Sequence, residues 1–154
     1  TLLTKLQQLL SAKKEISLGF MPQDYHKKLE LDLSPVTYLS QTGQKEELQK
    51  IQSHLASLNF SYPEMQHQIR SLSGGQQGKL LLLDLVLSKP NFLLLDEPTR
   101  NFSPTSQPEI RKLFATYPGG LVTVSHDRRF LKEVCTSLYR LTEHGFEVVD
   151  LQDL

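Results

Sequence analysis

A short apolar run that ends in two acidic residues constrains the fold of this chain most. It reads Phe92-Leu93-Leu94-Leu95-Asp96-Glu97 and is followed by Pro98. An unbroken run of this kind is typical of a strand that is buried on both faces of a parallel sheet. Similar runs lie at 16–21 and 121–125, and we expect the second of these to be buried on both faces as well. Strands that alternate with helices predict an α/β fold with a mostly parallel sheet.

The helices are predicted from apolar residues at helical spacing and from capping residues. At 44–58, Leu48, Ile51 and Leu55 fall on one face, which predicts an amphipathic helix. Ser34 and Ser73 are suited to cap the helices that follow them. The expected helices lie at 1–10, 35–39, 44–58, 73–87, 107–117 and 128–135, with a connecting segment at 59–71 and a hairpin at 137–149.

A glycine-rich loop, SGGQQGK at 73–79, raises the question of a phosphate-binding P-loop. The P-loop pattern G-x-x-x-x-G-K-[ST] needs a first glycine and a hydroxyl residue after the lysine that binds Mg²⁺. Here Ser73 stands at the first position and Leu80 follows Lys79. The segment before the loop is polar, whereas a P-loop follows an apolar strand. We therefore exclude a P-loop at these residues.

Polar residues follow each of the three predicted strands. Gln23 comes after the first strand, Asp96 and Glu97 end the second, and His126 follows the third. Because the carboxyl ends of parallel strands meet at one edge of a sheet, we expect these side chains to lie together where ligands bind. Two adjacent carboxylates after a buried strand are costly unless a cation or a proton transfer uses them. The alternative, in which Asp96 only caps the next helix, stays open.

Composition narrows the function classes. The 154 residues are 38% hydrophobic, enough for one ordinary core, and include no apolar run of the roughly 18 residues that a membrane span needs. The formal net charge is zero, so composition gives no basic footprint of a nucleic-acid binder. A single cysteine, Cys135, excludes an internal disulfide. These features fit a protein of the reducing cytoplasm.

Four motifs, in this order, resemble the C-terminal two-thirds of an ATP-binding cassette (ABC) ATPase. They are Gln23, LSGGQ at 72–76, LLLDEP at 93–98 and SHD at 125–127. The resemblance implies the core of a P-loop NTPase with a mostly parallel sheet and a helical signature subdomain. Thr1-Leu2-Leu3 resembles the residues that follow the P-loop in this family. We therefore expect that the P-loop, or Walker A motif, precedes residue 1 and that the cassette here is truncated.

The resemblance assigns roles to the residues at the sheet edge. It implies that Asp96 binds Mg²⁺ as the Walker B aspartate and that Glu97 is the catalytic glutamate that activates water. It implies that His126 is the switch histidine at the γ-phosphate of ATP and that Gln23 senses the metal and water. ATP and Mg²⁺ are thus the expected cofactors.

The glycine-rich loop is the signature motif of the family. The resemblance implies that Ser73, Gly74, Gly75 and Gln76 bind ATP that is held by an opposite cassette. A serine hydroxyl, two glycines with accessible backbone and a helix N-terminus are chemically suited to a phosphate.

Four segments are expected on this basis. Residues 1–34 form a core helix, a strand and the Q-loop; 35–72 form the helical subdomain; 73–136 carry the signature helix, Walker B, D-loop and switch histidine; and 137–154 form a C-terminal hairpin. The D-loop segment at 100–104, RNFSP, departs from the family pattern because it lacks the usual acidic residue.

The sequence SHDRRFL at 125–131 is similar to that of the ABC-F branch, whose members carry two cassettes on one soluble chain and act on the ribosome in translation or antibiotic resistance. The expected function is ATP hydrolysis by such a protein, with a second cassette and the ribosome as partners. We expect residues 1–154 alone to be inactive. Two alternatives remain: the nucleotide-binding subunit of a membrane transporter, and a non-catalytic fragment that supplies only a signature face.

Overall fold

The computed structural model of the chain describes residues 2–24 and 26–154, so Thr1 of the T-L-L match lies outside the described residues. Three strands, β1 (Leu18–Met21), β2 (Phe92–Asp96) and β3 (Gly120–Val124), form a parallel sheet with β2 in the centre. In the register of the sheet, Met21 pairs with Leu95 and Asp96 pairs with Val124. The three strands therefore end side by side, and the polar residues that follow them leave the same edge.

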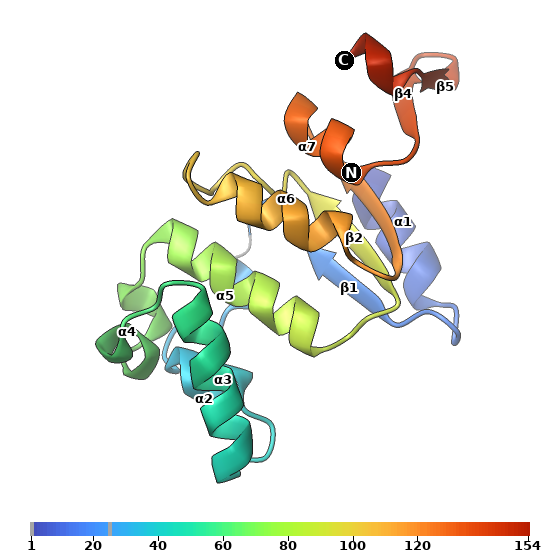
Figure 1. The fold of residues 1–154 in the computed structure, drawn as a ribbon. Helices are drawn as coiled ribbons and strands as arrows, with labels where there is room; N and C mark the ends of the chain where they lie inside the picture. The colour runs from blue at the N-terminus through green and yellow to red at the C-terminus, as the bar shows by residue number, and fades with distance from the viewer. Residues whose placement is uncertain (1, 25) are drawn as a thin grey trace.

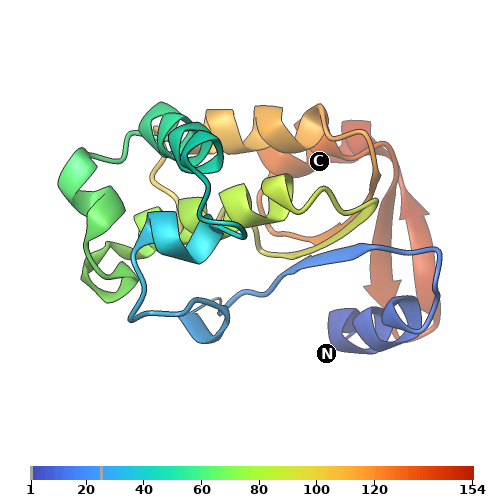
Figure 2. The ribbon, with the colours of Figure 1, turned by 90° about the horizontal axis from the view of Figure 1, so that it is seen from below.

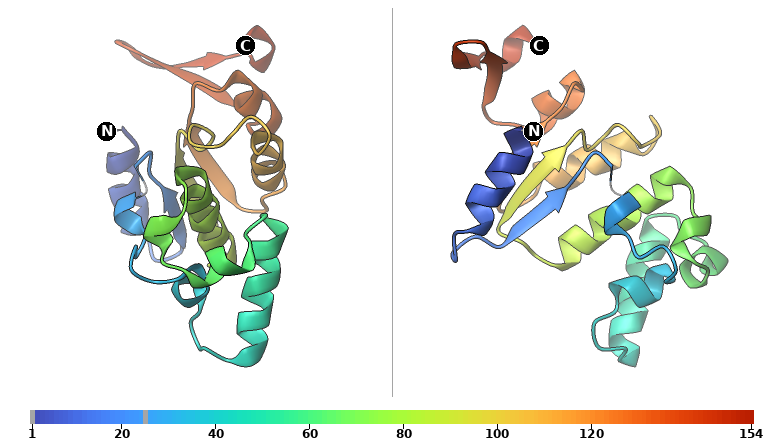
Figure 3. Two further views of the ribbon diagram at one scale, coloured as in Figure 1. Left: turned by 90° about the vertical axis from the view of Figure 1, so that its left-hand side faces the viewer. Right: turned by 180° about the vertical axis from the view of Figure 1, so that it is seen from behind.

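Helices cover both faces of this sheet. The helix α1 (Leu2–Ser11) lies on one face against β1 and β2, while α5 (Gly74–Leu87) and α6 (Gln107–Ala115) lie on the other (Figures 2 and 3). The helix α7 (Arg128–Val134) packs beside α6, where the rings of Phe114 and Phe130 meet edge to face at 5.9 Å. Central strand β2 is buried on both faces, as predicted, with Leu93, Leu94 and Leu95 at most 3% exposed.

The prediction that strand β3 is buried on both faces is wrong. Its residues Val122 and Val124 are 37% and 40% exposed. Val122 pairs with Leu94 and so points to the face that carries α1. Because α1 packs on β1 and β2, this side of β3 stays uncovered among the described residues.

The short helices α2 (Pro35–Leu39), α3 (Lys45–Ser57) and α4 (Tyr62–Gln66) gather at the end of α5 away from the hairpin (Figure 1). Ser34 caps α2 as predicted, since its side chain accepts a hydrogen bond from the backbone N–H of Thr37 at 3.2 Å. The prediction that 59–71 only connects two helices is wrong. This segment forms α4 and the 3₁₀ turn η2 (Ile69–Ser71), because Ser61 and Glu64 make a reciprocal capping box.

The remaining elements lie at the ends and in the loops. Strands β4 (Leu138–Thr142) and β5 (Gly145–Val149) form the predicted antiparallel hairpin, and Gly145 takes the positive φ that its turn requires. Two further 3₁₀ turns are η1 (His26–Lys28) and η3 (Leu151–Asp153). Of the helices in the described part of the chain, none has the length and apolar character needed to cross a membrane.

Candidate functional site

The sequence-predicted residues meet in one cleft at the carboxyl edge of the sheet. The cleft has a volume of about 600 Å³. It is lined by Gln23, Asp96, Glu97, Thr99, Arg100, Gln107, Val124, His126 and Asp127. The four residues expected at this edge, Gln23, Asp96, Glu97 and His126, are all among them, which confirms the predicted juxtaposition.

Glu97 is held in an unusual backbone conformation. Its φ is 49°, in the left-handed region that residues other than glycine rarely adopt. Two backbone hydrogen bonds hold this conformation: the Glu97 N–H donates to the Val124 carbonyl at 2.9 Å, and the Glu97 carbonyl accepts from the Arg100 N–H at 3.1 Å. Such a conformation costs about 1–3 kcal/mol and is enriched at functional sites.

The Glu97 side chain points toward His126. Its Oε2 accepts a hydrogen bond from the His126 backbone N–H at 3.3 Å, and its Oε1 lies 3.5 Å from His126 Nε2. The Glu97 side chain is only 14% exposed, whereas that of His126 is 96% exposed. The carboxylate is thus fixed against the sheet edge, and the imidazole stands on its open side, where it is free to meet a ligand.

Asp96 occupies the last position of β2 and does not cap a helix. The next helix, α6, has Ser106 at its N-cap position, so the alternative role of Asp96 as a cap is wrong. The described residues contain no group of three or more His, Cys, Asp or Glu that could hold a metal ion unaided. Mg²⁺ is commonly bound by one or two carboxylates together with substrate phosphates. Asp96, with Gln23 in the same cleft, fits that kind of site.

The signature loop forms the N-terminus of α5, outside this cleft. The Ser73 side chain accepts from the Gln76 N–H at 3.3 Å, and Gln76 Oε1 accepts from the Ser73 N–H at 3.0 Å, which makes a capping box. The side-chain amide of buried Gln77 donates to the carbonyls of Ile69 and Leu72, each at 3.2 Å. The loop is therefore held by several hydrogen bonds, and none of its residues is among those that line the cleft.

The D-loop segment adds residues that the sequence interpretation left without a role. Arg100 and Thr99 line the cleft, and Phe102 is buried in the core at 5% exposure. The carbonyl of Asn101 lies close to Gly75 of the signature loop, 3.5 Å from where a Cβ on that glycine would be. The position of Arg100 directly after the DEPT residues could have signalled its place in the cleft.

A parallel sheet with the carboxylates of Asp96 and Glu97 at its edge and a capped glycine loop on a helix defines the core of a nucleotide-binding cassette. The sequence profile of the family described as ABC transporter matches residues 3–100, and the chain belongs to that family. The ABC ATPase resemblance and the α/β fold class predicted from the sequence are confirmed.

Curated relatives and solved structures agree with this assignment. The chain is 32% identical over 137 residues to the "Probable ATP-binding protein YheS" of Escherichia coli K12, covering 89% of this chain and 22% of the relative. It is 26% identical over 137 residues to "ATP-binding cassette sub-family F member 3" of Pongo abelii, covering 89% of this chain and 19% of the relative. The chain thus spans about a fifth of the length of these relatives.

The fold is similar to that of the ATP-binding cassette MJ0796. Its dimeric post-hydrolysis structure, bound to ADP and Pi, matches with a TM-score of 0.73 at 17% identity, covering 96% of this chain and 67% of that one. A second dimeric structure of MJ0796, described as a bacterial ABC transporter cassette, matches with a TM-score of 0.65 at 18% identity, covering 85% of this chain and 60% of that one.

Proposed function

We propose that this chain is the catalytic part of a cassette that hydrolyses ATP with Mg²⁺. The observation that carries the proposal is the convergence of Glu97, His126, Asp96 and Gln23 in one cleft, with the Glu97 carboxylate held at a strained backbone position. General bases need such fixed geometry, because proton transfer requires the base within hydrogen-bonding reach of the water.

Each residue of the cleft has a separate task in this proposal. Glu97 orients an attacking water and accepts its proton, while Asp96 and Gln23 hold Mg²⁺ and its water. His126 donates from its exposed imidazole to the terminal phosphate. Mg²⁺, when bound, neutralises charge on the phosphate oxygens. The contact of 3.5 Å between Glu97 and His126 supports this division of tasks, because both side chains can then reach the same phosphate group and its attacking water.

A second cassette completes the site in this proposal. Ser73, Gly74, Gly75 and Gln76 do not line the cleft, and in this proposal they bind ATP that is held by a partner cassette. The α5 N-terminus favours an anion there through its dipole. We further propose that ATP binding requires the P-loop of the complete cassette, and that residues 1–154 alone bind ATP weakly and do not hydrolyse it.

We propose that the cassette is divided into four segments. Residues 1–34 contribute the core helix, strand and Q-loop; 35–72 form the helical subdomain; 73–136 carry the signature, Walker B, D-loop and switch histidine; and 137–154 form the hairpin. In this arrangement the helical subdomain joins the Q-loop to the signature loop, and so connects the two nucleotide-binding faces.

The complete protein is proposed to be a cytoplasmic ABC-F protein that acts on the ribosome, as a translation factor or in antibiotic resistance. Two observations support this finer proposal: the SHDRRFL sequence at 125–131, and the similarity to a relative whose name places it in sub-family F.

Co-sedimentation of the complete protein tests this proposal. Tagged protein is run through a sucrose gradient with a non-hydrolysable ATP analogue or with ADP, and the membrane fraction is collected in parallel. We expect the protein in the ribosomal fractions with the analogue and in the light fractions with ADP. Recovery with an integral membrane partner, and none with ribosomes, would replace the ABC-F proposal with that of a transporter subunit.

A further inference from the structure

Two helix caps in this structure are joined by a single acidic side chain, that of Glu64 on α4. Its Oε2 accepts from the backbone N–H of Ser61 at 2.7 Å and from the Ser61 hydroxyl at 2.9 Å. Its Oε1 accepts from Nε2 of Gln76 at 2.5 Å. Gln76 belongs to the capping box of α5, so the cap of α4 and the signature loop share this carboxylate.

The carboxylate determines which way the Gln76 amide faces. An ionised carboxylate only accepts hydrogen bonds, so Nε2 of Gln76 must point to it. The Gln76 Oε1 then faces the other way and accepts from the Ser73 backbone N–H at 3.0 Å. The hydrogen bonds from the Ser61 backbone and from Gln76 also hold the pKa of Glu64 below its usual value, so the side chain is ionised at neutral pH.

The Gln76 side chain in turn holds Ser73 in place through the Ser73 backbone N–H. Ser73 Oγ accepts from the Gln76 backbone N–H at 3.3 Å, and its own hydroxyl hydrogen can then donate to a ligand of this exposed loop. A hydroxyl that accepts from the helix and donates outward is well placed to bind a phosphate oxygen.

We propose that Glu64 is a positioning residue of the signature loop: through Gln76 it holds Ser73 ready to donate to a phosphate of ATP on the partner cassette. The inference rests on the proposed function. Glu64 lies in a short helix of the helical subdomain and is not among the residues that line the cleft, so its proposed contribution is to the second nucleotide-binding face.

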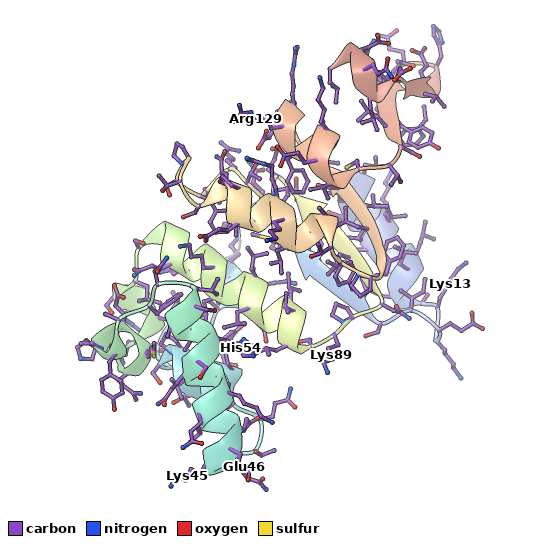
Figure 4. The ribbon with its side chains drawn as sticks, viewed as in Figure 1. Lys13, Lys45, Glu46, His54, Lys89 and Arg129 are labelled. Atoms are coloured by element: carbon purple, nitrogen blue, oxygen red, sulfur yellow. The ribbon has the colours of Figure 1, made fainter. Side chains whose placement is uncertain are left out.

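The isosteric variant Glu64→Gln tests the proposal because an amide has only one accepting oxygen. The new side-chain NH₂ group must then face either the donors of Ser61 or the Nε2 donor of Gln76. The cap on that side loses its acceptor. In the complete protein we expect kcat/KM for ATP to fall roughly fivefold, the equivalent of one net hydrogen bond. The matched control is Glu46→Gln, an exposed side chain on α3 that projects into solvent far from the signature loop (Figure 4), and it should leave kcat/KM unchanged.

A double variant that swaps the side chains at positions 64 and 76 should restore the hydrogen bond between the two caps. In the double variant Glu64→Gln with Gln76→Glu, the amide at 64 accepts from Ser61 and donates to the carboxylate at 76, whose other oxygen accepts from Ser73. We expect this variant to restore the hydrogen bonds of the loop but not kcat/KM, because the new carboxylate at 76 repels the phosphate, so its readout is the exchange measurement below. A Glu64→Gln protein as active as the parent overturns the proposal.

A measurement without nucleotide separates this inference from the proposed function. Hydrogen–deuterium exchange of residues 70–78 should be faster in Glu64→Gln than in the parent, unchanged in Glu46→Gln and restored in the double variant. Unchanged exchange in Glu64→Gln overturns the positioning role even if the parent hydrolyses ATP. If the parent hydrolyses no ATP, the proposed function fails, and exchange alone decides whether Glu64 holds the loop.

Discussion

The Glu97 carboxylate contacts His126 at two points, with Oε2 at 3.3 Å from the backbone nitrogen and Oε1 at 3.5 Å from Nε2 of the ring. The first contact ties the end of β2 to the residue that follows β3 and fixes the carboxylate. The second places the imidazole, which is 96% exposed, where it can turn from Glu97 to a ligand. The pair thus combines a fixed carboxylate with an exposed imidazole, and the predictions about catalysis depend on this difference.

Replacing His126 by alanine should impair catalysis without loss of stability. We expect kcat for ATP hydrolysis by the complete protein to fall at least about tenfold, because a positioned hydrogen-bond donor to the phosphate is lost. The melting temperature should stay close to that of the parent, since the side chain is 96% exposed. His144→Ala, in the exposed turn of the hairpin, is the control for a histidine outside the cleft. If His126→Ala and His144→Ala had the same kcat, His126 would have no role in catalysis.

Asp96→Asn should raise the Mg²⁺ concentration needed for activity. The amide keeps the shape of the side chain but loses the negative charge, so half-saturation by Mg²⁺ should require at least about tenfold more metal. A Mg²⁺ titration of ATP hydrolysis measures this shift, with Asp153→Asn as the control on η3. An unchanged Mg²⁺ requirement in Asp96→Asn contradicts the metal-binding role.

A glutamate in place of Ser73 should weaken the action of the signature loop. A carboxylate about 4 Å from a phosphate near a protein surface is repelled by about 4 kcal/mol, so kcat/KM for ATP should drop at least about tenfold. Ser53→Glu, on the exposed side of α3, adds the same charge elsewhere and should have no such effect. If both variants behave alike, the loop does not face a phosphate.

Glu47 should make stability depend on pH in the acidic range. Its carboxylate accepts from the backbone N–H groups of Gln41 at 2.9 Å and of Thr42 and Gly43 at 3.0 Å, and from the hydroxyls of Ser40 and Thr42. These bonds, that from Gln41 first, lower the pKa of Glu47 from 4.5 to about 2. Because the pKa in the folded state is lower, this stabilisation is complete above pH 4.5 and is lost as the pH falls toward 2.

The variant Glu47→Gln checks this expectation by thermal unfolding across pH. At pH 7 it should melt below the parent, and the difference should narrow as the pH falls below about 4.5, the usual value for the free carboxyl. The neighbouring variant Glu46→Gln should show no such pH-dependent difference. A gap between Glu47→Gln and the parent that stays constant from pH 7 to pH 3 would contradict the account of this turn.

The sequence predicted the sheet and its edge well, because local signals agreed with the tertiary fold. The apolar run before Asp96 indicated a central strand, and strand order then placed Gln23, Glu97 and His126 at one edge. Ser73 was a reliable cap for α5, since capping depends only on the residues of the first helical turn.

One miss depended on contacts between distant parts of the chain, whereas another had a local signal. The exposure of Val122 and Val124 reflects how far α1 extends across the sheet, which the composition of the strand does not encode. Helix α4 had a local signal, the S-x-x-E spacing of Ser61 and Glu64, that could have been recognised. The bond between Glu64 and Gln76 joins side chains 12 positions apart in different helices, and only the fold brings them together.

The most direct test of the central claim is ATP turnover by the complete protein with Glu97→Gln. The amide preserves the shape of the side chain but cannot accept a proton from water, so kcat should fall about 10²-fold or more while ATP stays bound. Steady-state turnover and the amount of ATP retained after gel filtration are measured together, with Glu109→Gln on α6 as the control. Strong retention of ATP with almost no turnover is the predicted result. A Glu97→Gln protein that keeps more than about a tenth of the parent rate contradicts Glu97 as the general base.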